Sequence, residues 1–116
     1  MNTILGIDPG LRVTGYGVIH QEKQNFTYES SGTIKTTQQD LDLAERIKII
    51  VTGIDEVIEK FSPSIVAIEK VFVNTNPQST LLLGQARGAA IAAIVSKEIN
   101  IYEYTALQIK KSVVGN

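Results

Sequence analysis

Two short apolar runs in the sequence each end in a carboxylate. Residues 3–7 form the first run, which Asp8 follows, and residues 65–68 form the second, which Glu69 follows. Continuous apolar runs of this length are typical of strands that are buried on both faces of a sheet. The pattern therefore predicts two buried strands, each with an acidic residue at its carboxyl end.

The segment after Asp8 predicts a tight turn and a second strand. In residues 14–18, Gly15 and Gly17 fall on one face of the strand and larger side chains fall on the other. The missing side chains would leave a groove beside Asp8, where the backbone of a ligand could come close. Taken alone, Asp-Pro-Gly at positions 8–10 is better explained as a simple turn, because each of its residues favours turns. The second carboxylate, Glu69, at the end of a second buried strand is what favours a functional site.

A further stretch, residues 26–35, alternates between apolar and polar positions. Phe26, Tyr28 and Ile34 are predicted to share one face, with polar residues on the other. This pattern is typical of a half-exposed antiparallel strand near the edge of a sheet. His20, the only histidine, is expected to be solvated at the mouth of the hairpin that precedes this strand.

The period changes to helical between Asp40 and Phe61, where apolar residues recur at three- and four-residue steps. Asp42 and Arg46 are spaced to form an i, i+4 ion pair on the wet side of this helix. A strand, a helix and a second buried strand predict a right-handed parallel crossover, which places residues 3–7 beside residues 65–68.

A second long helix is predicted from Gln78 to Glu98, and its apolar residues surround it on nearly all sides. One core-facing stripe does not need that much apolar surface. Gly84, Gly88 and Ala92 form a line of small residues that would admit another backbone, so this helix is the expected homodimer contact. Residues 100–104 then predict a last short strand, and Thr105 is a candidate cap for a final helix.

The element order predicts an α/β fold with a mixed five-stranded sheet, in which an antiparallel hairpin adjoins parallel strands, flanked by helices. The 116 residues are expected to form one domain, 1–116, that is incomplete at its C-terminus, because the last residues are an apolar pair and a turn signal. The chain contains no cysteine, which excludes disulfides and thiolate zinc sites. We find no signal peptide or membrane-spanning run and expect a soluble, intracellular protein.

Asp8 and Glu69 carry the candidate chemistry. Adjacent strands lie about 4.8 Å apart, and carboxylates roughly 5 Å apart repel by about 3 kcal/mol at an effective dielectric of about 20. A divalent cation would offset that repulsion, and oxygen-only ligands favour Mg²⁺ or Mn²⁺. The alternative is that both carboxylates are merely solvated at strand ends. With a formal net charge of −1, any polyanion site would have to be a local basic patch or a metal.

Four stretches of the sequence carry a family resemblance. LGIDPGLRVTGYGVI, VAIEKVFV, LLLGQARGAAI and YEYTALQIKKSVVG together resemble the RuvC family of Holliday junction resolvases, in register to the last residue. The resemblance implies a ribonuclease H-like fold and a cytoplasmic homodimer in which each subunit nicks one strand of a four-way DNA junction during recombination and repair. It also implies a Mg²⁺ cofactor, with Mn²⁺ as a substitute, and association with a branch-migration helicase complex.

The same resemblance implies roles for four residues. Asp8 and Glu69 match catalytic, metal-binding acids. Phe72 matches an aromatic residue that contacts junction bases, and without the family it would be read as a hydrophobic plug for its loop. Lys110 matches a basic residue that faces the DNA backbone, and otherwise it would be read as a solvated lysine.

The chain also departs from the family pattern. The remaining active-site acids of the family lie beyond Asn116, and two-metal phosphodiester cleavage needs enough carboxylates to hold both cations. A catalytically inactive junction-binding module is therefore the alternative function. An actin-like kinase would require a second Asp-Gly phosphate loop in a duplicated domain, which this sequence lacks.

Overall fold

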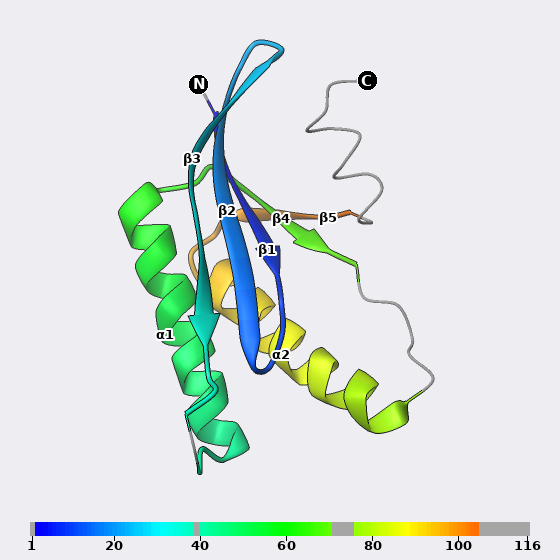
Figure 1. Cartoon of the computed structure of the whole chain (residues 1–116). Helices are drawn as coiled ribbons and strands as arrows, with labels where there is room; N and C mark the ends of the chain where they lie inside the picture. Colours follow the sequence, from blue (N-terminus) through cyan, green and yellow to red (C-terminus); the bar gives the residue numbers. More distant parts are fainter. Residues whose placement is uncertain (1, 39, 71–75, 105–116) are drawn as a thin grey trace.

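The computed structural model describes residues 2–38, 40–70 and 76–104. These residues form one mixed sheet and two helices (Figure 1). In chain order the elements are β1 (Asn2–Asp8), β2 (Val13–Glu22), β3 (Asn25–Lys35), α1 (Leu43–Phe61), β4 (Ile65–Glu69), α2 (Pro77–Val95) and β5 (Asn100–Tyr104).

The five strands lie in the order β3-β2-β1-β4-β5, with β1 in the centre. β1 pairs antiparallel with β2 and parallel with β4, and β4 pairs parallel with β5. Because β1 and β4 are parallel, their carboxyl ends meet at the same edge of the sheet. The predicted fold class and the α1 crossover between β1 and β4 are confirmed.

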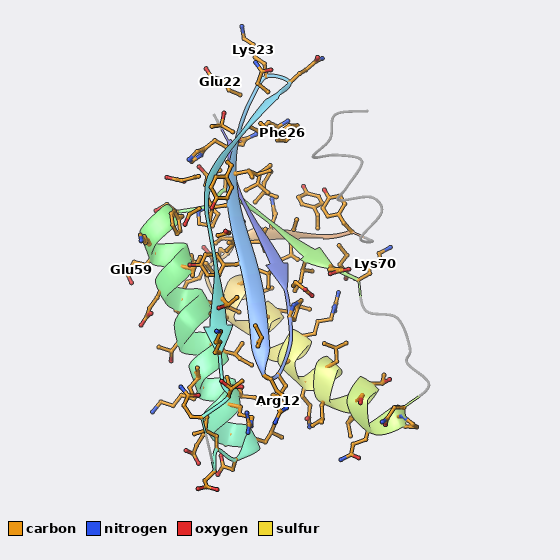
Figure 2. The ribbon with its side chains drawn as sticks, viewed as in Figure 1. Arg12, Glu22, Lys23, Phe26, Glu59 and Lys70 are labelled. Carbon is orange, nitrogen blue, oxygen red and sulfur yellow. The ribbon has the colours of Figure 1, made fainter. Side chains whose placement is uncertain are left out.

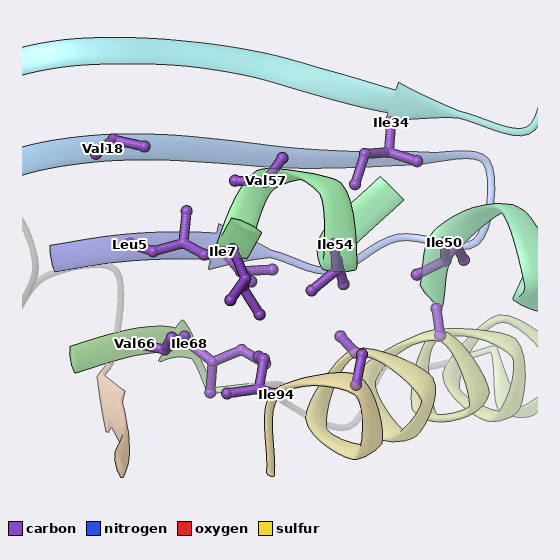
Figure 3. Packing of buried hydrophobic residues seen from close by; sticks show 14 residues of the cluster. Leu5, Ile7, Val18, Ile34, Ile50, Ile54, Val57, Val66, Ile68 and Ile94 are labelled. Carbon is purple, nitrogen blue, oxygen red and sulfur yellow. The ribbon is translucent and has the colours of Figure 1, made fainter. Parts of the chain in front are cut away.

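The core lies between one face of the sheet and the two helices (Figure 3). Leu5 and Ile7 of β1 point into it, whereas the intervening Gly6 lines a groove on the opposite face, as the two-residue period of a strand requires. The buried apolar residues of the core are Leu5, Ile7, Val18, Ile34, Ile50, Ile54, Val57, Ile58, Val66, Ile68, Ala86, Ala90, Ala93 and Ile94. We call the opposite side the open face, because neither α1 nor α2 packs on it.

A β-bulge in β3 changes which side chains are buried. Val18 pairs with Ser30, but the next residue, Ile19, pairs with Tyr28, so one extra residue is inserted at Glu29. The bulge switches the side chains on its N-terminal side to the opposite face of the sheet. Phe26 and Tyr28 are consequently 38% and 68% exposed, while Ile34 is buried on the helix side. The prediction that these three residues share one face is therefore wrong.

His20 is also placed differently from the prediction. Its Nδ1 lies 3.0 Å from the Thr3 hydroxyl of β1, and its Nε2 lies 2.6 Å from a carboxylate oxygen of Glu29. The half-buried imidazole thus joins β1, β2 and the bulge of β3, and it is not a freely solvated side chain.

The helix boundaries differ slightly from those predicted. Asp42 is the N-cap of α1, where it accepts a hydrogen bond from the backbone N–H of Glu45 in a capping box. Asp42 and Arg46 consequently do not form the ion pair that their spacing suggested, and Arg46 turns to Thr36. The second helix begins at Pro77, behind the N-cap Asn76, and ends at Val95 rather than Glu98.

Candidate metal centre

Asp8 and Glu69 lie at the carboxyl ends of β1 and β4. The parallel pairing of these strands matches Ile7 with Ile68, so each acidic residue is one position past this pair. Because Ile7 and Ile68 point into the core, Asp8 and Glu69 point to the open face. The strand register therefore places the two acidic residues side by side, as the sequence predicted.

Glycines lie beside this pair, so few side-chain atoms stand above the sheet there. Asp8 pairs with Gly15 of β2, where an added Cβ would lie 4.0 Å from the Cβ of Asp8. Gly17, two residues further along the open face, has space around it for a Cβ. A groove of about 480 Å³ runs over this face, lined by Ile4, Gly6, Gly17, Ile19, Gln21, Phe26, Ile65, Ala67, Tyr102 and Tyr104. The groove includes Gly17, as predicted, but its mostly apolar lining includes neither Gly15 nor Asp8, so it does not lie directly beside the carboxylates as the sequence suggested.

The protonation of Glu69 is affected by its surroundings and by Asp8. Burial raises the pKa of Glu69 above its usual value of 4.5, and the charge of Asp8 and a side-chain hydrogen bond with Asp8 raise it further. A cation between the two groups would reverse this effect, because it favours both ionised forms. The donor set is oxygen only, which fits Mg²⁺ or Mn²⁺. Within the described ranges, no group of three or more acidic, histidine or cysteine side chains forms a fuller ligand set.

Two basic residues flank this edge of the sheet (Figure 2). Lys70 follows Glu69 directly, and its backbone N–H donates a 2.7 Å hydrogen bond to the carbonyl of Tyr104. Arg12 is exposed in the loop between β1 and β2. Neither residue was predicted from the sequence to belong to the site. Their positions next to the two acidic strand ends were visible in the sequence, but exposed basic residues are common and give a weak signal.

Tyr104 was also missed as a neighbour of the site. It pairs with Glu69 in the register of β4 and β5 and lines the open-face groove. Its position beside Glu69 follows from the pairing of β4 with β5, which the sequence does not reveal. Phe72 and Lys110, the predicted DNA-binding residues, lie outside the described residues, as does the helix predicted to start at Thr105.

The family of the chain is decided by a sequence match over nearly its whole length. The family model described as "Crossover junction endodeoxyribonuclease RuvC" matches residues 4–116. The chain belongs to the RuvC family. The RuvC of Janthinobacterium sp. (strain Marseille) is 61% identical over 112 residues, which is 97% of this chain and 61% of that protein. The chain thus spans about three fifths of the length of such RuvC relatives.

Solved structures agree with the RuvC assignment. "T. thermophilus RuvC in complex with Holliday junction substrate" has a TM-score of 0.85 and 27% identity, and the match covers 97% of this chain and 70% of that one. The yeast mitochondrial Holliday junction resolvase Ydc2 has a TM-score of 0.71 at 13% identity, over 94% of this chain and 55% of that one, and it supports the fold alone. These neighbours confirm the ribonuclease H-like fold. Among the described helices, none has the length and apolar character needed to cross a membrane.

Proposed function

We propose that this RuvC chain belongs to a Mg²⁺-dependent endonuclease that makes symmetric nicks in four-way DNA junctions during recombination and repair. The observation that carries the proposal is the pair of carboxylates, Asp8 and Glu69, on adjacent parallel strand ends of a RuvC-family sheet. The named RuvC relatives and the junction-bound T. thermophilus structure support it. Nothing in the fold or in these similarities favours the inactive junction-binding module.

Asp8 and Glu69 are the residues that would hold Mg²⁺, or Mn²⁺ in its place. When bound, such cations supply Lewis-acid activation of the attacking water and stabilisation of the leaving oxygen. The contribution of the chain is to keep two carboxylate groups on one face of a rigid sheet, beside glycines that admit a DNA backbone. Glu69 must be ionised to serve as a ligand, so its raised pKa makes metal binding compete with protons.

Recognition of the junction is proposed to rest on Phe72 and Lys110. An aromatic side chain that stacks on an exposed base contributes about 1–3 kcal/mol, and a lysine at a phosphate adds a salt-dependent term. With a net charge of only −1, the chain has no broad positive field to attract DNA. Local contacts of this kind, together with a bound cation, would therefore decide where DNA binds.

The proposed assembly is a homodimer through α2. Its exposed side carries a stripe that we call the α2 stripe, with residues at three- and four-residue steps: Leu81, Gly84, Gly88, Ala92 and Val95. Leu81 is 64% exposed and Val95 is 53% exposed, and neither Gly84 nor Gly88 has an atom within 4 Å of an added Cβ. An isologous contact would cover this stripe and pair two metal sites for two symmetric nicks. A branch-migration helicase complex and a cytoplasmic location complete the proposal.

The activity can be tested by adding the C-terminal part of the Janthinobacterium relative to this chain. In Mg²⁺, the fusion should nick a four-way junction symmetrically, whereas its Asp8→Asn variant should be inactive and its Glu22→Gln variant fully active. The 116-residue chain alone should bind the junction more tightly than duplex DNA at low salt and nick it only at background level. Equal nicking by the fusion and its Asp8→Asn variant would contradict the proposal.

A further inference from the structure

Two polar side chains are fully buried among the described residues, and both bind the loop that follows Asp8. Thr14 and Thr36 are each 0% exposed. The Thr14 hydroxyl donates to the carbonyl of Gly10 at 2.8 Å and accepts from the N–H of the same residue at 3.2 Å. The Thr36 hydroxyl donates to the carbonyl of Leu11. A buried hydroxyl costs stability unless it is bonded, so these contacts hold the loop to fixed positions.

Thr36 connects this loop to helix α1. Its backbone N–H donates to the carbonyl of Arg12 at 2.8 Å, which continues the β2–β3 ladder by one step. The guanidinium of Arg46, in the first turn of α1, donates to the carbonyl of Thr36 and lies 3.2 Å from its hydroxyl oxygen. A hydroxyl can donate one bond while it accepts others, and a charged donor polarises it. Arg46, Thr36 and Leu11 thus form one hydrogen-bonded chain.

The loop itself has little freedom to adopt another shape. It spans only the four residues between Asp8 and Val13, and Pro9 within it is buried. At Gly10, an added Cβ would lie 2.3 Å from the carbonyl oxygen of Val13, so the backbone passes very close to itself. Asp8 is the last residue of β1, and the direction of its carboxylate therefore depends on how this loop leaves the strand.

We infer that Thr36 and Arg46 are positioning residues for Asp8, which they orient through the backbone of residues 10–12. Neither side chain contacts Asp8, and their effect on a bound cation is indirect. This inference rests on the proposed role of Asp8 as a metal ligand. A purely structural role for the two residues would alter the stability of the fold and leave the affinity of the folded protein for a cation unchanged.

The test is the affinity of the folded chain for Mn²⁺, measured by electron paramagnetic resonance at a temperature well below unfolding. Thr36→Val keeps the shape of the side chain and removes the hydroxyl. Because Thr36 acts on Asp8 only through the loop, this variant should weaken Mn²⁺ binding by about tenfold, the low end of the loss expected for a group bonded directly to a metal ligand. Thr36→Ser restores the hydroxyl and should bind within about twofold of wild type. Arg46→Met retains an unbranched apolar side chain, loses the donor and should weaken binding in the same direction.

Two control variants separate positioning from stability. Thr33→Val makes the same substitution at an exposed position of β3, and Ile58→Val loosens the core near the far end of α1. Both should bind Mn²⁺ as wild type does. If Thr36→Val and Arg46→Met bind Mn²⁺ like these controls, the inference is wrong. If Thr36→Val does not fold, Arg46→Met decides the question. If the wild-type chain itself binds no Mn²⁺, the proposed metal site fails first.

Discussion

Asp8 and Glu69 stand one residue past the paired Ile7 and Ile68, on adjacent parallel strands, and both point to the open face of the sheet. In the absence of a cation their charges repel, which raises the pKa of Glu69 in addition to the effect of its burial. Two like charges held side by side lower the stability of the metal-free protein.

Removing one of the two charges should stabilise the metal-free protein. Asp8→Asn is expected to raise the free energy of unfolding by up to about 1 kcal/mol, because Asp8 is exposed and solvent screens much of the repulsion. Urea unfolding in a chelator gives the measurement. Glu59→Gln, at an exposed position of α1, is the control and should change stability by less than about 0.5 kcal/mol. A loss of stability in Asp8→Asn would mean that Asp8 makes favourable contacts that outweigh the repulsion.

The stability of the metal-free protein should depend on pH because the pKa of Glu69 is raised by folding. Because its folded-state pKa lies above the usual 4.5, the folded protein holds more protons than the unfolded chain between that value and the raised pKa. Neutral Glu69 contributes fully to the stability of the folded protein below pH 4.5. This contribution is lost as the pH rises through the raised pKa. As the pH rises from 4.5 through the raised pKa, metal-free wild type should therefore lose stability relative to Glu69→Gln. Parallel stability curves for the two proteins would rule out a raised pKa.

The β1–β2 loop should not tolerate a side chain at Gly10. Gly10→Ala places a Cβ 2.3 Å from the carbonyl oxygen of Val13, and we expect it to lower the free energy of unfolding by about 1–3 kcal/mol. Gly17→Ala is the matched control, because no atom lies within 4 Å of its added Cβ. Gly17→Ala should leave the free energy of unfolding unchanged or raise it by up to about 1 kcal/mol, because alanine restricts the conformations of the unfolded chain. Similar losses in both variants would show that steric closure of the loop is not the cause.

The homodimer should depend on the α2 stripe. Gly88→Glu puts a charge in the middle of the stripe at a position with free space around it, and glutamate favours a helix over glycine by about 0.5–1 kcal/mol. We therefore expect a stable monomer by sedimentation at micromolar concentrations, where wild type is expected to be a dimer. Thr52→Glu, at an exposed position of α1, should remain dimeric. A dimer that survives Gly88→Glu would place the interface elsewhere.

The sequence predicted the sheet and the acidic pair because both follow from short-range patterns. Continuous apolar runs predicted β1 and β4, and the helical period between them implied the crossover that brings Asp8 to Glu69. The faces of β3 could not be predicted in the same way. One extra residue at Glu29 reverses the two-residue period, and this moves Phe26 and Tyr28 to the open face.

Polar contacts between residues far apart in the chain also could not be predicted from the sequence. The i, i+4 spacing suggests an ion pair between Arg46 and Asp42, but Arg46 binds Thr36. His20 binds Thr3 and Glu29 rather than water alone. Such contacts depend on which strands and helices meet in space, and spacing along the chain does not encode that.

The central claim, that Asp8 and Glu69 share one divalent cation, is tested most directly by titrating the folded chain with Mn²⁺ in a calorimeter. Wild type should show a binding site that is lost in both Asp8→Asn and Glu69→Gln and retained in Glu59→Gln. Binding should also weaken as the pH falls toward the raised pKa of Glu69, because protons compete for the ligand. If the wild type and both site variants bind Mn²⁺ with equal affinity, the two carboxylates do not form the metal site.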